Sequence, residues 1–302
     1  MSPAKINNAF NGAVALICLA GIYGFIGYFA RELAPGLSLW QQLYIRLVLA
    51  IPFLWITFLK KINARNCVEL LKTEPFLVGL RSICLFVVSV PLYFYATQHA
   101  KLGNVAFLQV LPYIFVLGAV INKEKLTKQK IVLMLLAMIG AYMIAVKSGL
   151  DFTHIGKGEL ASIISGVMFS LGFVTRKKHR SKANDYEISL TLMTISILAV
   201  IILSILTGDQ LPHPADVDIR FFILLIVASY LNVAIILLSN YGFRHVRDTF
   251  ANNIMALEGT FGLLFGYLIY REIPVLREVL GASIILVSAI ASAFFVKQKT
   301  QN

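Results

Sequence analysis

Three charged side chains stand within long apolar runs of this 302-residue chain, and they are the first candidates for chemistry. Glu258 lies about eight residues into the apolar run 250–270, while Arg46 and Arg81 lie within two other runs. A charged side chain at the centre of a bilayer costs about 2.5–3.5 kcal/mol on insertion scales, so such a residue is expected to face a polar interior. We expect Glu258 to bind a cationic group of a cargo or to take up a proton. A structural pair with an Arg or Asn is the alternative.

The two arginines each have two interpretations. A long Arg side chain near the end of a membrane helix can snorkel to a headgroup phosphate, and this interpretation is favoured for Arg46. For Arg81, the choice between snorkelling and a contact with a carboxylate or phosphate of the cargo stays open. Both arginines therefore belong to the candidate binding set.

Uncharged polar side chains recur at helical spacing in the neighbouring apolar runs. Amides that face lipid lack hydrogen-bond partners, so these groups are expected to point towards the protein interior. There they either line a cargo site or form interhelical hydrogen bonds, which contribute about 0.6 kcal/mol each. The uncharged candidates for cargo binding are Tyr93, Gln109, Tyr113, Asn232, Asn240 and Asn253.

The composition predicts helices that hold these residues inside a membrane. Hydrophobic residues make up 58% of the chain and charged residues 14%, and the mean hydropathy is +0.79, which excludes an ordinary soluble domain. A bilayer core of roughly 30 Å needs about 20 mostly apolar residues per helix. The sequence thus predicts an all-α, polytopic membrane protein with ten transmembrane helices. Their windows are 11–30, 39–59, 75–97, 103–121, 131–147, 156–175, 188–207, 221–243, 250–270 and 279–296.

Residues recur along the chain at a nearly constant offset, which indicates an internal duplication. Five spans per half is an odd number, so the second half must enter the membrane from the opposite side. We therefore predict two inverted five-helix repeats, residues 1–149 and 150–302, that rock about a central site as in secondary transporters. The matched pairs are Gly21 with Gly166, Gly27 with Gly172, Arg31 with Arg176, Tyr95 with Tyr241, His99 with His245, Lys101 with Arg247 and Glu124 with Glu272.

The basic residues indicate orientation and not a nucleic-acid partner. The net charge is +12, but Lys and Arg are spread over the loops and not gathered on one face, so no nucleic acid is expected. With the N-terminus inside, 18 of the 27 Lys and Arg lie in cytoplasmic segments and 7 in the opposite loops. By the positive-inside rule we expect a multi-pass protein of the cell (inner) membrane with both termini cytoplasmic. The three cysteines show no metal spacing, and neither metal nor cofactor is expected.

The chain resembles the EamA family of the drug/metabolite transporter superfamily over nearly its whole length. The resemblance rests on the ten spans, on the segment 44–50 (Tyr-Ile-Arg-Leu-x-x-Ala), and on two charged corners between apolar runs, at Glu124 and Glu272. In that family's repeat, a proline precedes the corner glutamate and a glycine often follows it. The resemblance implies the family's ten-helix fold.

The two copies depart from the family's repeat in different places. The first copy keeps the proline, Pro112, but has Leu133 where the glycine is expected. The second copy keeps the glycine, Gly281, but has Gly259 where the proline is expected. The motifs are therefore loose, and they indicate the fold better than the cargo.

The resemblance implies a carrier of small molecules and not an enzyme, with a central cavity lined mainly by spans one, three, four, six, eight and nine. An amino-acid-like or other zwitterionic cargo is the leading interpretation. Leu80-Arg81-Ser82 and Leu257-Glu258 are similar to a subgroup that includes uptake carriers for S-adenosylmethionine and riboflavin, so a nucleoside-derived or vitamin cargo is the alternative. The expected partners are this small-molecule substrate and the lipid bilayer. A coupling proton and a homodimer stay open.

Two other functional classes fit the sequence less well. A membrane-embedded lipid-modifying enzyme needs clustered carboxylates for a metal, or a His close to an acid, and no span contains such a motif. A channel needs repeated pore-lining polarity, which a duplicated five-helix unit does not specifically predict. No phosphate-binding loop for ATP-driven transport occurs. The prediction is therefore a secondary transporter.

Overall fold

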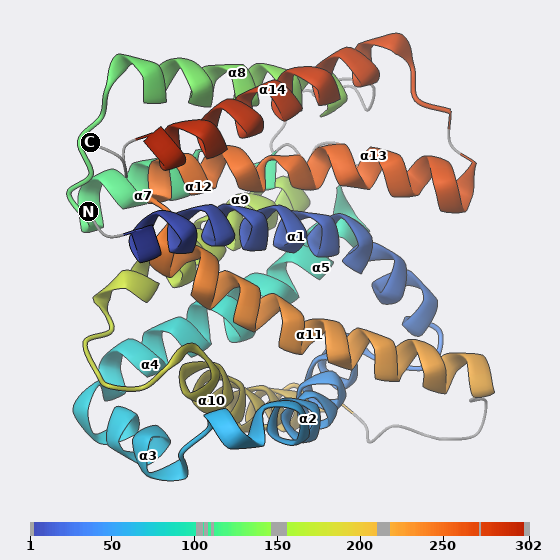
Figure 1. Ribbon diagram of the computed structural model, residues 1–302. Helices are drawn as coiled ribbons and strands as arrows, with labels where there is room; N and C mark the ends of the chain where they lie inside the picture. Colours follow the sequence, from blue (N-terminus) through green and yellow to red (C-terminus); the bar gives the residue numbers. More distant parts are fainter. Residues whose placement is uncertain are drawn as a thin grey trace.

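The structure is a computed structural model of the chain, and it describes residues 3–100, 105, 108–109, 112–145, 156–209, 218–271 and 273–298. These residues form helices and connecting loops, with no strand among them, so the predicted all-α class is confirmed for this part of the chain. Both termini lie at one end of the molecule (Figure 1). We call this end the terminal face and the opposite end the remote face.

The helices of the first half follow the predicted windows closely. They are α1 (Pro3–Leu33), α2 (Leu39–Phe58), the short η1 (Leu59–Lys61), α3 (Ala64–Thr73), α4 (Pro75–Ser82), the π-helical η2 (Ile83–Val88), α5 (Ser89–His99), α7 (Tyr113–Ile121) and α8 (Lys128–Ala145). Those of the second half are α9 (Lys157–Val174), the short η4 (Thr175–Lys178), α10 (Asp185–Leu206), α11 (Ile219–His245), α12 (Asp248–Met255), α13 (Leu257–Tyr270) and α14 (Leu276–Gln298).

Among the described residues, seven helical segments are long and apolar enough to cross a membrane. Large apolar side chains such as Ile56, Phe76 and Leu206, which are 78%, 80% and 74% exposed, lie where lipid would cover them. The protein is therefore a multi-pass membrane protein. A count of ten spans stays a prediction, because window 103–121 lies partly outside the described residues and α8, α12 and α13 are shorter helices. The seven segments are Asn8–Ile26, Leu39–Lys61, Pro75–Ala96, Lys157–Lys178, Asp185–Leu206, Ile219–His245 and Leu276–Phe294.

The predicted window 250–270 is covered by two consecutive helices, α12 and α13, which meet at Ala256. Glu258 consequently lies in the first turn of α13, beside this junction. The first half has a comparable start at α7, which begins directly after Pro112. Proline has no N–H and its ring blocks the preceding turn, so it favours a helix start at this point. Interrupted helices near mid-membrane are typical of transporters.

Equivalent polar caps begin α2 and α10. Ser38 and Gln41 form a capping box at α2, with the Gln41 N–H donating to Ser38 Oγ at 3.2 Å and the Ser38 N–H donating to Gln41 Oε1 at 2.9 Å. Asn184 and Glu187 form the same box at α10, with bonds of 3.0 and 2.8 Å. These boxes satisfy N–H groups that a helix start leaves unpaired. The second helix of each half thus starts from the same local chemistry.

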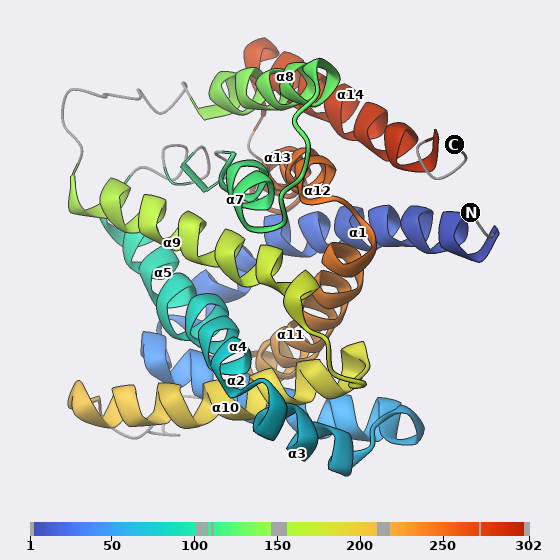
Figure 2. The same cartoon turned by 90° about the vertical axis from the view of Figure 1, so that its left-hand side faces the viewer.

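The two halves exchange helices across their interface. α1 packs on α11, and α9 packs in the same way on α5, while α2 pairs with α10 and α8 pairs with α14. In Figure 2, α1 enters beside the N label whereas α9 enters from the other side, so the two helices run in opposite directions. Glycines permit both crossings: a Cβ on Gly12 would lie 3.0 Å from His245 Cβ, and a Cβ on Gly158 would lie 2.7 Å from the His99 carbonyl carbon. The helices therefore follow an inverted, intertwined arrangement.

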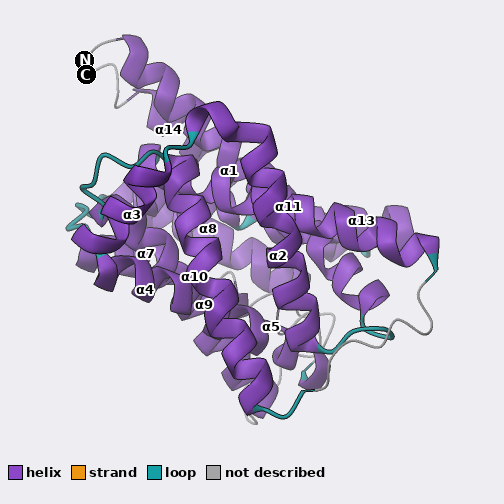
Figure 3. Cartoon of the chain, turned by 90° about the horizontal axis from the view of Figure 1, so that it is seen from below, coloured by secondary structure: helices purple, strands orange, loops and turns teal. Residues whose placement is uncertain are grey.

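Two glycines let the backbones of α8 and α14 approach each other closely. A Cβ on Gly140 would lie 2.6 Å from the Gly281 carbonyl oxygen, and a Cβ on Gly281 would lie 2.6 Å from the Gly140 carbonyl oxygen. Ser288 on the same seam donates its hydroxyl to the Leu133 carbonyl oxygen at 2.7 Å. Small residues let membrane helices approach this closely. Figure 3 gives a third view of these helices, again with both termini on one side.

This contact predicts a selective effect of alanine at Gly140. Gly140→Ala is expected to lower the thermal unfolding midpoint, because backbone atoms must move apart and overpacking costs about 1–3 kcal/mol. Gly79→Ala on α4 is the matched control, since no atom lies within 4 Å of its new Cβ. Alanine there is expected to be neutral or slightly stabilising. Equal midpoints for the two variants in detergent would contradict the close approach of α8 and α14.

Candidate functional site

A cavity that is partly open to the outside lies among the helices, towards the remote face. α1 contributes residues from its last third and α2 residues from its first half, which are the parts nearest the remote face. The lining is mainly apolar. The polar residues that line it are Tyr23, Arg46, Tyr93, Gln109, Ser170, Asn232, Ser239, Asn252 and Glu258.

Glu258 and Arg46 bring opposite charges to this cavity without pairing to each other. Arg46 is only 3% exposed, so its side chain does not reach the surface. The snorkelling that its position in the sequence favours is therefore not seen in the structure. Its Nη2 donates to Asn232 Oδ1 at 3.3 Å, and its Nε has no hydrogen-bond partner. Glu258 has no hydrogen bond or ion pair with another described residue. A buried charge without a counter-charge is costly, so both groups favour a ligand of opposite charge.

Three further candidates from the sequence also reach the cavity, and they come from three different helical segments. Asn232 on α11 accepts from Arg46, and Tyr93 on α5 contributes to the wall. Gln109 lies in the predicted fourth span, and its Nε2 donates to the Ser162 carbonyl oxygen at 3.1 Å. The structure therefore brings five of the nine candidate binding residues together.

The other four candidates lie outside the lining. Tyr113 packs its ring against Gly166, which lines the cavity, and the Tyr113 hydroxyl is buried without a hydrogen bond. Asn253 is fully buried and donates to Ser292 Oγ on α14 at 3.0 Å. Its neighbour Asn252 points into the cavity instead, because successive residues of a helix face different sides.

Arg81 and Asn240 form a buried polar layer between the cavity and the terminal face. Arg81 is 0% exposed, and its Nε donates to the Gly172 carbonyl oxygen at 2.9 Å while its Nη2 donates to Asn240 Oδ1 at 2.7 Å. Asn240 Nδ2 in turn donates to Ser189 Oγ at 2.8 Å. Since Phe173 and Ser239, the neighbours of Gly172 and Asn240, line the cavity, this layer lies directly beneath its floor. Arg81 thus joins the two halves below the site.

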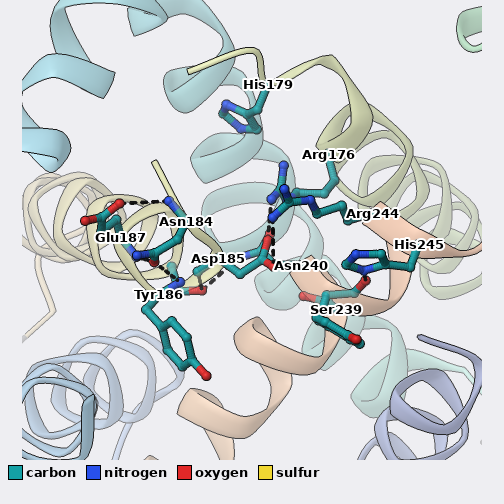
Figure 4. Close-up of polar contacts among 12 residues, drawn as sticks. Arg176, His179, Asn184, Asp185, Tyr186, Glu187, Ser239, Asn240, Arg244 and His245 are labelled. Atoms are coloured by element: carbon teal, nitrogen blue, oxygen red, sulfur yellow. Dashed lines mark hydrogen bonds and ion pairs between the residues drawn. The ribbon is translucent and has the colours of Figure 1, made fainter. Parts of the chain in front are cut away.

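A salt-bridge cluster continues this layer towards the terminal face. Arg81 Nη1 lies 3.2 Å from His179 Nε2, and His179 Nδ1 lies 2.5 Å from Glu74 Oε2. Figure 4 shows the adjoining part, where the guanidinium groups of Arg176 and Arg244 converge on Asp185. None of these groups lines the cavity.

A second polar cluster joins the halves through Glu124. Its carboxylate accepts from the backbone N–H groups of Asp248 and Thr249 at 2.8 and 3.2 Å, and from Lys177 Nζ at 3.1 Å. The carboxylate therefore caps the start of α12, a helix of the other half. Asn122 Nδ2 adds a bond of 2.6 Å to Asp248 Oδ2. The matching corner residue, Glu272, lies outside the described residues.

Aromatic side chains form a part of the wall that sequence reasoning missed. Tyr23, Phe169 and Phe173 contact one another with ring centroids 5.9–6.5 Å apart, and Phe173 stacks on Phe243 at 4.7 Å. Phe169 and Phe173 stand four residues apart, a spacing that places both rings on one helix face. The same spacing also occurs in ordinary helix cores, so it could not identify a cavity without the structure.

Metal binding has no support among the described residues, which contain no group of three His, Cys, Asp or Glu side chains placed to hold an ion. The cavity offers one carboxylate, one guanidinium, amides, hydroxyls and rings. Such a set can bind an organic ion through charge, hydrogen bonds and stacking.

Comparison with known proteins assigns the chain to a family. The profile described as "EamA-like transporter family" matches residues 10–146 and again residues 156–294. The chain belongs to the EamA-like transporter family. The resemblance seen in the sequence is thereby confirmed, and the transporter carries the family's repeat twice. No curated protein matches the transporter. A solved structure titled "Crystal structure of protein" has a similar fold, with a TM-score of 0.74. The match covers 98% of this chain and 99% of the other chain, at 13% sequence identity. At this identity the likeness shows the fold alone.

The salt-bridge cluster predicts that His179 makes stability depend on pH. Burial first, and the nearby Arg81 guanidinium second, lower the pKa of His179 from 6.5 to about 4. The folded protein therefore holds this histidine neutral between these pH values, while the unfolded chain binds a proton. The resulting stabilisation is complete above pH 6.5 and is lost as the pH falls towards about 4.

Thermal unfolding of the detergent-solubilised protein between these pH values measures this effect. His179→Gln is expected to flatten the fall of the unfolding midpoint with acid relative to the wild type. His99→Gln is the control, because His99 is exposed and its ring contacts its neighbour Tyr95 at the end of α5. An unchanged slope in His179→Gln would show that this ring does not titrate as the structure implies.

Proposed function

We propose that the transporter is a secondary carrier of small zwitterionic, amino-acid-like molecules, which it moves by alternating access. The observation that carries this proposal is the pair Glu258 and Arg46, which line one cavity with no described counter-ion. A cargo ammonium group would pair with the Glu258 carboxylate, and a cargo carboxylate would bind Arg46 and Asn232. Planar guanidinium groups suit carboxylates because they donate two parallel hydrogen bonds.

Inverted halves support the alternating-access part of the proposal. The cavity lies towards the remote face, and the contacts of Arg81 and Glu124 join the halves on the terminal side. Rocking of one half against the other would separate these contacts and open the terminal side. Their polar character favours reversibility, since exposed polar groups find new partners in water. The positive-inside rule supports a cytoplasmic terminal face in the cell membrane.

A second cargo class is favoured by one observation, the aromatic wall of the cavity. Tyr23, Phe169 and Phe173 would stack on the ring of a nucleoside-derived or vitamin cargo. Glu258 would then bind a cationic group or carry a coupling proton. Both cargo classes use the same cavity, so a transport screen distinguishes them.

Reconstituted transport tests the carrier mechanism. Proteoliposomes loaded with unlabelled cargo are expected to take up labelled cargo faster than empty ones, because a carrier must return its site across the membrane. Uptake is also expected to saturate with concentration. The screen compares amino acids with nucleosides and vitamins at equal concentrations. Uptake of the active compounds that neither saturates nor responds to internal cargo would indicate a channel and reject the proposal.

Two charge-removing variants test the site itself. Glu258→Gln and Arg46→Gln are each expected to weaken the apparent affinity for cargo by about tenfold or more, since a hydrogen bond to a charged group contributes about 1.5–3 kcal/mol. Glu69→Gln and Arg65→Gln on the exposed face of α3 are matched controls that remove the same charges far from the cavity. Normal counterflow in both cavity variants, at normal protein levels, would reject the assignment of the site.

A further inference from the structure

A second, strongly basic pocket lies on the terminal face, apart from the cargo cavity. It is formed by the segment after α9 and by the end of α11, and none of its residues lines the cargo cavity. The residues that line it are Arg176, Lys177, His179, Ser181, Ala183 and Arg244. The run 176–182 contains five Lys and Arg and no acid, and two of them, Arg176 and Lys177, line the pocket. Orientation in the membrane explains its charge but not its arrangement as a pocket.

Two guanidinium groups in this pocket have only one carboxylate, that of Asp185, as an ion-pair partner among the described residues. Arg176 and Arg244 share a single carboxylate, with Arg176 Nη2 donating to Asp185 Oδ1 and Arg244 Nη1 lying 3.4 Å from Asp185 Oδ2 (Figure 4). The remaining donors of Arg244 point to no described acceptor, and its side chain is 51% exposed. One guanidinium therefore stays largely uncompensated at the mouth of the pocket.

Two buried polar atoms of the pocket have no hydrogen-bond partner among the described residues. They are Arg176 Nε, on a side chain that is only 4% exposed, and Ser181 Oγ. An unpaired buried donor is unfavourable, and an acceptor placed in the pocket would satisfy both atoms. His179 is not such a donor, because Glu74 and Arg81 occupy its two ring nitrogens. Lys177 is paired with Glu124 and Asp248, so its charge is compensated within the protein.

We propose that this pocket binds a phosphate-type oxyanion, held by Arg176, Ser181 and Arg244. A tetrahedral oxyanion offers several acceptor atoms at once, which suits a pocket lined by two guanidinium groups and a serine hydroxyl. The pocket lies at the ends of the membrane-crossing α9 and α11, the level at which headgroups meet water. The anion is therefore either a free phosphate group or the phosphate of an anionic lipid. The pocket shares no residue with the cargo cavity, so the inference holds for any cargo.

Binding of inorganic phosphate to the full-length protein in detergent tests the first source. Phosphate at constant ionic strength, balanced with chloride, is expected to raise the thermal unfolding midpoint in a saturable way, because a ligand that binds only the folded state stabilises it. Arg244→Gln is expected to weaken this binding by about tenfold or more. Ser181→Ala provides a smaller, uncharged change and is expected to weaken it severalfold. Arg247→Gln is the matched control, since Arg247 is exposed near Arg244 but does not line the pocket.

Lipid nanodiscs test the second source. The same variants are compared in phosphatidylcholine alone and in phosphatidylcholine with phosphatidylglycerol, and the rise of the midpoint caused by the anionic lipid is measured. A rise that Arg244→Gln abolishes and Arg247→Gln keeps supports the headgroup as the ligand, and the same pattern with inorganic phosphate supports a free phosphate. The pocket is not an oxyanion site if neither phosphate nor the anionic lipid raises the unfolding midpoint, or if chloride raises it as much as phosphate does. An equal loss of the rise in Arg244→Gln and Arg247→Gln would also reject the proposal.

Discussion

The dry interior of the bilayer is the constraint on which this structure depends. Without water, every polar group within the spans must find a partner in the protein or remain costly. Arg81 is fully buried and satisfies this requirement through three nitrogen atoms. They contact the carbonyl oxygen of Gly172, the side-chain amide of Asn240 and the imidazole of His179. Because these partners belong to the second half of the chain, satisfying one buried charge also joins the two halves.

Two charged groups in the cargo cavity depart from this rule. Glu258 and Arg46 lie within the same cavity, yet neither has a counter-ion among the described residues. A folded protein that retains such groups gains little stability from them, so they are best explained by a ligand. The aromatic wall formed by Tyr23, Phe169 and Phe173 adds apolar surface around the charges. The proposed zwitterionic cargo would use both charges and the rings that line the same cavity.

Exchange of helices between the halves places the polar clusters on one side of the cavity. Glu124 caps α12, which belongs to the other half, and Lys177 approaches the same carboxylate from a third segment. Small residues such as Gly140 and Gly281 meanwhile let α8 and α14 touch backbone to backbone. The contacts of Glu124 are between charged and polar groups, whereas α8 and α14 meet through small residues. A rocking motion would break the first kind and preserve the second.

The sequence by itself determined the helical class, the membrane location, the duplication and most helix ends, because these follow from local hydropathy, spacing and caps. It also singled out Glu258, since a lone acid in an apolar run is visible without a fold. Only the tertiary structure separated Arg46 from Arg81, which look alike in sequence: one lines the cavity and the other lies beneath it. It likewise revealed that Glu124 caps a distant helix and that two helices meet at Ala256 within one predicted window. These outcomes depend on which side chains meet across helices far apart in the chain, and local patterns carry no information about such meetings.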